Sequence, residues 1–445
     1  MKKGLLIILI FGFIGLSKAQ EPLSMGDAIQ ICLQNNFDIR IEAKNIEAAQ
    51  LNNKWSEAGL FPTFYFNLSN NYTIMDNTEN PFTFQPGVTS NIGLTPSINM
   101  DWTLFAGLKV IRNKERLVRL ENQTRGNAML VVENTIFNLM RAYYQVVLNK
   151  MKIRLLSEVL DFSKEKVAYY RVKSEIGTAN SIDVLQFESQ MYTDSMNLEL
   201  LKLNYRNSIR NLNMLMNVPV DTTFTLTDSL SKLLPDVQYE AMAELMKSSN
   251  QNLKNQYINL ELQQTNTKLQ GSGLYPTLSF SASASPNFGW FRSMNVDSAL
   301  FTQSINYNFG FNLRYTIFNN WKTKRAFKVG KIQEEILQMR VEDMEVELDN
   351  NLKNQLDSYN QRRHLEQLSF QNAEFSKKIW ELGKEQYSRG IISSIDLTTL
   401  HNSYLNTLVN YYDNLYNLVD AYTELYKLTG GILRAVEEGK PLFDK

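Results

Sequence analysis

Two residue types on which catalytic and metal sites depend are almost missing from this chain of 445 residues. It has one cysteine, Cys32, and two histidines, His364 and His401. A single cysteine excludes an internal disulfide, and without a CxxC pair or clustered histidines the sequence offers no zinc site. We therefore expect no metal ligands and no cofactor. We interpret Cys32, which lies in a helical pattern, as a small buried apolar residue.

Proline and an excess of charge of either sign are also scarce. The ten prolines leave residues 97–218 and 287–440 free of any. Because proline breaks helix interiors, these spans predict very long helices. The 46 basic and 46 acidic residues balance, so no basic face for nucleic acid is indicated. There is no glycine-rich phosphate loop, GxSxG or HExxH motif, so we do not expect an enzyme.

Residues 1–19 have the three parts of a secretory signal peptide. A positive start, Met1-Lys2-Lys3, precedes an apolar run at 4–16 and a small-x-small cleavage site, Ser17-Lys18-Ala19. The run is shorter than the ~20 apolar residues of a spanning helix, and no cysteine follows the cut to carry a lipid. No later run reaches spanning length. The mature chain is therefore predicted to be soluble or to enter a membrane as a closed β-barrel.

The rest of the chain consists of two similar halves, with corresponding positions about 213 residues apart. Three motifs return in order: Gly59-Leu60-Phe61-Pro62-Thr63 as Gly273-Leu274-Tyr275-Pro276-Thr277, Trp102-Thr103-Leu104-Phe105 as Tyr315-Thr316-Ile317-Phe318, and Ser181-Ile182-Asp183 as Ser394-Ile395-Asp396. Such order at nearly constant spacing indicates tandem duplication. We assign the first repeat to 20–236 and the second to 237–445.

Each repeat contains two predicted strands in which apolar and polar residues alternate. They lie at about 60–74 and 92–105, and again at about 274–286 and 303–318; the linkers at 75–91 and 287–302 are predicted hairpin loops. Ile305, Tyr307 and Phe309, for example, alternate with Asn306 and Asn308. A period of two predicts a sheet with one apolar and one polar face. Each strand exceeds the ~9–11 residues that cross a bilayer.

Helical patterns fill the remainder of both repeats. A first helix is expected at 24–58 and 238–271, a long helix at 107–176 and 320–389, and a returning helix at 182–216 and 395–429. Gly177 and Gly390 are plausible C′ residues at the ends of the long helices. Apolar spacings that alternate between three and four predict coiled-coil packing of each long helix on its returning partner.

Four strands per chain are too few to close a barrel, and a bilayer admits only helices and closed barrels. We therefore expect three chains to supply twelve strands around a lumen, with the helices continuing the tube into water. Two alternatives remain. A secreted coiled-coil scaffold or adhesion protein with a soluble sandwich would not expose apolar stripes on every strand. A porin-like diffusion pore would leave the long helices unexplained.

These features together resemble the TolC-type outer membrane efflux proteins, also called outer membrane factors. The signal peptide, the duplicated helix–strand–strand–long helix–helix unit and the Gly-x(5)-Asp turns carry the resemblance over essentially the whole mature chain. It implies a mixed, mostly α fold. A homotrimer would form a twelve-stranded barrel in the outer membrane lipid of a Gram-negative-type bacterium, continued by a twelve-helix periplasmic α-barrel.

The resemblance also implies a function and partners. The chain would be the exit duct of a tripartite efflux or type I secretion system, conducting drugs, metals or polypeptides passively to the exterior. Its partners would be a periplasmic adaptor (membrane fusion) protein and an energised inner-membrane transporter.

Asp183 and Asp396 occupy matched positions just after the two helical turns. In one interpretation Ser181 and Ser394 are the helix N-caps, and each aspartate is favoured in a first turn by the helix dipole. In the other, six carboxylates of a trimer form an acidic collar at the inner end of the tunnel. Sequence leaves both open.

The family resemblance implies a gate after the second turn. Asp396 matches an acidic gate residue of the family. Thr399 stands where a second acid is expected, and Ile392 stands where the family has a gate arginine. These departures predict a constriction that is built differently.

The exposed turns and the strand ends supply the remaining candidate sites. Gly177, Ser181, Gly390 and Ser394 mark the turns, which the resemblance favours as contacts for the adaptor over simple chain reversal. Trp102, Trp290, Phe291 and Trp321 lie in or near strand ends, where aromatic side chains anchor at membrane interfaces. For Trp321, a packed aromatic is the alternative.

Overall fold

The computed structural model describes residues 21–83, 87–230, 235–293 and 300–438. The predicted signal peptide at 1–19 lies outside these residues. The chain divides into two compact units: one comprises Met1–Ile41, Met129–Asn250 and Glu347–Lys445, and the other Glu42–Ala128 and Gln251–Val346. Among the described residues, no helix combines the length and the apolar character that crossing a membrane requires.

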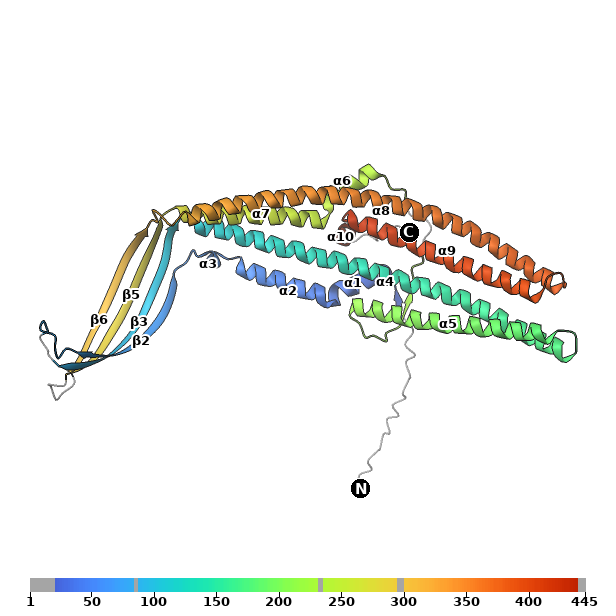
Figure 1. Ribbon diagram of the computed structural model, residues 1–445, viewed down its shortest axis with the longest axis horizontal. Helices are drawn as coiled ribbons and strands as arrows, with labels where there is room; N and C mark the ends of the chain where they lie inside the picture. The colour runs from blue at the N-terminus through green and yellow to red at the C-terminus, as the bar shows by residue number, and fades with distance from the viewer. Residues whose placement is uncertain (1–20, 84–86, 231–234, 294–299, 439–445) are drawn as a thin grey trace, which may run out of the picture. The chain divides into compact units, whose positions relative to one another are not determined.

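The second unit contains a four-stranded antiparallel sheet (Figure 1). Its order is β2 (Thr63–Asp76), β3 (Val88–Ala106), β5 (Thr277–Ser293) and β6 (Leu300–Arg314). The expected hairpin loops at 75–91 and 287–302 are wrong in extent. Backbone pairing continues as far as Asp76↔Val88 and Phe291↔Leu300. Strand therefore replaces both ends of the first expected loop, and residues 287–293 and 300–302 of the second.

Two prolines explain why β5 was expected to end too early. Pairing between β3 and β5 runs through Leu94↔Phe288 and resumes at Ile98↔Ala284, and Pro96 and Pro286 lie in the gap. A proline lacks the N–H that a ladder needs. Because both prolines lie in the same gap, only one stretch of the β3–β5 pairing is interrupted. Strand β5 continues beyond that stretch to Ser293.

The helices before the strands are broken where one continuous helix was expected. Residues 24–58 form α1 (Met25–Asn35), α2 (Phe37–Asn52) and α3 (Trp55–Ala58), and residues 238–271 form α6 (Tyr239–Ser249) and α7 (Gln251–Gly271). Asn36 and Asn250 stand at the breaks. Each leaves helical geometry, with ψ of 131° and 121°, and its Nδ2 donates at 2.9 Å to the carbonyl of Leu215 or Leu428.

Most of each long helix, from Met129 or Glu347 onward, lies in the first unit together with its returning partner. The pairs are α4 (Lys109–Glu175) with α5 (Ser181–Met216), and α8 (Lys322–Ser388) with α9 (Ser394–Leu428), followed by the short α10 (Gly431–Glu438). Ser163 on α4 bonds Asp194 on α5, and Trp380 on α8 contacts His401 on α9. The helices of each pair are therefore antiparallel neighbours, as Figure 1 shows.

The core of the first unit sits where α1, α4, α5 and α9 meet. Cys32 is fully buried there among apolar side chains, which confirms its apolar role, and burial raises the pKa of its thiol to about 11. Tyr143 donates at 2.8 Å to the carbonyl of Leu23. That bond anchors β1 (Glu21–Leu23), which pairs in parallel with β4 (Phe224–Leu226).

Candidate functional site

Each long helix ends in the same turn, built around a glycine. Gly177 has φ of 75° and Gly390 has φ of 74°. In the first turn the N–H of Gly177 donates to Ser174 and that of Thr178 to Lys173; the second turn repeats both bonds, from Gly390 to Tyr387 and from Ile391 to Gln386. This is the Schellman pattern, which needs a left-handed residue at C′. Glycine reaches that conformation without steric cost.

The N-caps of the returning helices lie one residue earlier than expected. Asn180 caps α5 by accepting from the N–H of Ile182 at 3.1 Å, and Ser393 caps α9 by accepting from that of Asp396 at 3.1 Å. Both caps have the extended backbone that an N-cap requires. Ser181 and Ser394 are instead the first helical residues, so the expectation that they cap is wrong.

The two matched aspartates accept different hydrogen bonds. Asp396 completes a capping box: its Oδ2 accepts from the N–H of Ser393 at 3.0 Å and from its hydroxyl at 2.7 Å. These hydrogen bonds hold the pKa of Asp396 below its usual value. Asp183 instead accepts a short hydrogen bond from the hydroxyl of Ser394, which also reaches Gln186 at 3.1 Å. Ser394 therefore ties the two turns together.

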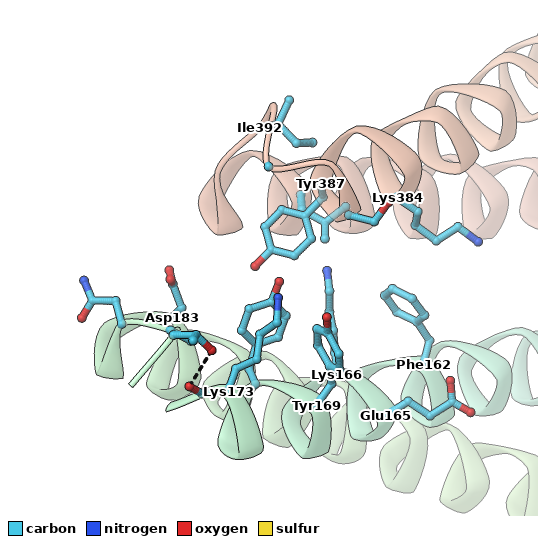
Figure 2. A pocket seen from close by; sticks show the side chains of 16 residues that line it. Phe162, Glu165, Lys166, Tyr169, Lys173, Asp183, Lys384, Tyr387 and Ile392 are labelled. Carbon is cyan, nitrogen blue, oxygen red and sulfur yellow. Dashed lines mark hydrogen bonds between the residues drawn. The ribbon is translucent and has the colours of Figure 1, made fainter. Parts of the chain in front are cut away.

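A cavity of about 500 Å³ lies beside these turns, between the α4–α5 pair and the end of α8 (Figure 2). Of the residues predicted for the constriction and the turns, it brings together Asp183, Gly390 and Ile392. Asp396 and Thr399 do not line it. The hydroxyl of Thr399 donates back to the carbonyl of Ile395 at 2.9 Å, within its own helix.

Lys166 is the most unusual residue of this cavity. Its Nζ is buried without a hydrogen-bond partner and lies 4.3 Å from the ring centroid of Tyr387, 4.7 Å from Phe187 and 5.2 Å from Phe162. Burial, and next the charge of Lys384, lower the pKa of Lys166 to about 7. Burial also raises the pKa of Tyr387, which is hydrogen-bonded to Tyr170.

A buried polar group adjoins the aromatic side of Lys166. Asp194 accepts from the hydroxyl of Ser163 at 2.6 Å and from Gln190 at 2.9 Å, and its Oδ2 lies 3.4 Å from Nε2 of His401. Burial opposes ionisation of Asp194, but its contacts with His401, Ser163 and Gln190 outweigh burial and hold its pKa low. His401 also stacks against Phe162, 6.2 Å between ring centroids.

Three of the four predicted interface aromatics lie on the sheet and one lies beside it. Trp102 on β3 pairs with Phe280, and its Nε1 donates to the carbonyl of Leu60 at 2.8 Å. Trp290 and its neighbour Phe291 are near the other end of β5, and the Trp290 ring lies 5.4 Å from that of Phe301. Trp321 precedes α8 with φ of 59° and is 55% exposed, so it is not packed in a core.

The sequence reasoning missed Lys166, Tyr387 and the Asp194–His401 contact. A signal for Lys166 was present, because Phe162, Lys166 and Tyr170 recur at intervals of four and so share one helix face. A lysine between two aromatic residues on a packed helix face indicates an ammonium group in contact with aromatic rings.

The sequence matches one described family over most of its length. The model of the family described as "Outer membrane efflux protein" matches residues 28–218 and 233–431. Toxin and drug export protein A of Aggregatibacter actinomycetemcomitans is 21% identical over 427 residues, covering 93% of this chain and 88% of that protein. The probable efflux pump outer membrane protein TtgC of Pseudomonas putida is 22% identical over 427 residues, covering 91% and 82%.

Solved structures resemble the chain in fold. The CmeC outer membrane channel of Campylobacter jejuni aligns with a TM-score of 0.76 at 15% identity, covering 94% of this chain and 90% of that one. The open state of the MtrE outer membrane channel of Neisseria gonorrhoeae aligns with a TM-score of 0.69 at 15% identity, covering 92% and 89%.

Proposed function

This chain belongs to the outer membrane efflux protein family, and we propose from that premise that it is an outer-membrane exit duct, conducting substrates passively from the periplasm or an inner-membrane pump to the exterior. The observation that carries the proposal is the combination of two features in one chain. A sheet of 14- to 19-residue strands exposes large apolar side chains. Two 67-residue helices, each about 100 Å long, continue the polypeptide.

The duct would be a homotrimer whose chains share one twelve-stranded barrel. In the described ranges β2 and β6 each pair on one side only, so both edges of the sheet offer free backbone groups. Such edges recruit further strands, and a bilayer tolerates only a closed set. On β6, Tyr307, Phe309 and Phe311 are at least 67% exposed in the single chain, as suits a surface that meets outer membrane lipid.

The positions of the tryptophans support a membrane-crossing sheet. Ile92 pairs with Trp290, and Trp102 lies ten residues beyond Ile92 on the same strand. Ten residues span about 33 Å along a strand. Tilted by about 40°, that becomes about 25 Å, the height of the apolar band of such barrels. Trp102 and Trp290, with Phe291, would thus mark the two interfaces, and Trp321 would reinforce the one on the helical side.

We also propose that the two halves, 20–236 and 237–445, arose by tandem duplication. The helices α4 and α8 are both 67 residues long, and α5 and α9 have 36 and 35. The Asn36–Leu215 bond in the first half corresponds to the Asn250–Leu428 bond in the second. A match in such a small detail supports common descent of the halves better than a match in length.

The turns are proposed as the contact for a periplasmic adaptor and as the constriction of the duct. Gly177, Ser181, Gly390 and Ser394 build two similar turns at the ends of paired helices, and the Ser394–Asp183 bond ties them together. Asp183 and Asp396 would supply negative charge there, with Ile392 and Thr399 in place of a charged lock. An adaptor seated on the turns would connect the duct to an inner-membrane transporter, in tripartite efflux or type I secretion.

Conductance across a lipid bilayer tests the proposed function. Purified full-length protein, added to a planar bilayer from detergent, should insert and give discrete single-channel currents. A scaffold or adhesion protein would extract into plain buffer and leave the bilayer resistance unchanged, and that result would refute the duct.

A further inference from the structure

The cavity beside the helical turns carries an excess of positive charge that nothing in the proposed duct requires. Lys166, Lys173 and Lys384 line it. In the ranges that the structure describes, every lysine in an ion pair is a different one. Three ammonium groups around about 500 Å³ therefore stand without a carboxylate partner, and the charge of Lys384 already disfavours the charge of Lys166.

In the described ranges the two carboxylates of the cavity, Asp183 and Glu165, form no ion pair with these lysines. Asp183 is engaged by the hydroxyl of Ser394. Glu165 lines the cavity, but Figure 2 shows its side chain extending away from the gap between Lys166 and Tyr387. The lining therefore carries a net positive charge in the part of the gap that aromatic side chains surround.

Two of the ammonium groups reach into the same gap. Figure 2 shows Lys166 and Lys173 extending from α4 toward the end of α8, where Tyr387 lies. The Nζ of Lys166 has three rings around it but no acceptor. A buried ammonium without an acceptor is costly, and a hydrogen bond to an anion is the strong kind that relieves such a cost.

From this geometry we propose that the cavity is a binding site for a small oxyanion, a carboxylate or phosphate group, held by Lys166 and Lys173 with Lys384 adding attraction. The rings of Phe162, Tyr169 and Tyr387 would receive an apolar body carried by that anion. Because the lining comes from both helix pairs, a bound anion would also join the α4–α5 pair to the end of α8. Binding of an anion here is separate from export, and it can be measured without a bilayer or a pump.

Calorimetric titration of the detergent-solubilised full chain tests the site. The probes are benzoate, which joins a carboxylate to a ring, and inorganic phosphate. We expect saturable binding of at least one: benzoate alone indicates a carboxylate-type ligand, and phosphate alone a phosphate-type ligand. Lys166→Met should weaken that binding about tenfold or more, the usual consequence of losing a charge-assisted hydrogen bond.

Lys164→Met is the matched control, because Lys164 lies on the same helix, is exposed and pairs with Asp161 at 3.4 Å. It should leave the affinity unchanged. Saturable heat from neither probe would overturn the proposal, as would equal affinity in Lys166→Met and in the unaltered protein.

A second measurement avoids any folding defect of the variant. In the unaltered protein, the bound probe should slow acylation of Lys166 by an amine reagent at least several-fold and leave Lys164 unaffected, as followed by mass spectrometry. Equal acylation rates of Lys166 with and without saturating probe would also overturn the site.

Discussion

The ammonium of Lys166 on α4 lies 4.3 Å from the centre of the Tyr387 ring on α8. This contact joins the two halves of the sequence at the end of the helices where both chain reversals occur. Cation–π attraction favours the charged lysine, whereas burial disfavours it, and burial dominates because the pKa falls to about 7. The stability of this region is therefore expected to depend on pH.

The first prediction concerns Lys166→Met. Between pH 7 and about 10.4, the ordinary lysine pKa, the unfolded chain binds more protons at this residue than the folded chain, so stability rises with pH there. Below pH 7 the full cost of the buried charge is present. Lys166→Met should thus raise the unfolding midpoint most at pH 6, with the gain shrinking toward pH 10.

Titratable neighbours of Lys166 also shape this profile, and single variants separate their effects. The titratable groups that line the cavities around Lys166 are Lys384 and Tyr387 on α8, Asp183 on α5, His401 on α9, and Glu165, Tyr169, Tyr170 and Lys173 on α4. Lys384→Met should raise the pKa of Lys166 and flatten the pH dependence. A gain from Lys166→Met that is constant from pH 6 to 10 would show that Lys166 is not the titrating group.

The second prediction concerns the paired asparagines. Asn36→Ala and Asn250→Ala each remove a 2.9 Å hydrogen bond and leave a helix-end carbonyl, of Leu215 or Leu428, without that donor. Each should lower the free energy of unfolding by about 1–3 kcal/mol, measured by urea titration in detergent. Exposed Asn45→Ala is the control, and its effect should stay within about 0.5 kcal/mol. Similar losses at both sites fit the proposed duplication; a loss at only one would count against it.

The third prediction separates charge from capping at the turns. Asp183→Asn and Asp396→Asn keep most hydrogen-bonding capacity but remove the charge. If the carboxylates form a collar, the double variant should reduce block by multivalent cations and change single-channel conductance. Thr399→Asp, which adds an acid near the turn, should strengthen that block. Unchanged block and conductance in the double variant would leave the aspartates only their roles in capping and in the Ser394 contact.

Local patterns predicted the regular elements, and exceptions arose where a distant segment decides the outcome. Alternation predicted the body of β6, because Tyr307, Phe309 and Phe311 keep period two without interruption, but the strand expected at 303–318 ends at Arg314. The end of β5 was placed too early, because a proline such as Pro286 normally ends a strand. Here the strand continues because Pro96 of β3 lies in the same gap of the pairing. Likewise Asn36 stands at a helix break, where its Nδ2 donates to the distant carbonyl of Leu215 and its Oδ1 accepts from the N–H groups of Asp38 and Ile39 in α2.

The candidate site was less accessible from the sequence. Ser393 and Ser394 are both capable N-caps, and only the backbone conformation selects Ser393. The neighbouring serine becomes free to bond Asp183, which lies 211 positions away in the chain. Lys166 shows the same limit: its helix face was visible, but its contact with Tyr387 depends on how two helix pairs pack, which residue spacing along one helix does not specify.

The mass of the detergent-solubilised protein tests the central claim most directly. If identical chains join to close one barrel, native mass spectrometry should give about three times the mass of one mature chain. The assembly should run as a single species that denaturation reduces to monomers. A monodisperse monomer that remains folded in plain buffer would contradict the account, because its sheet would then need no partners.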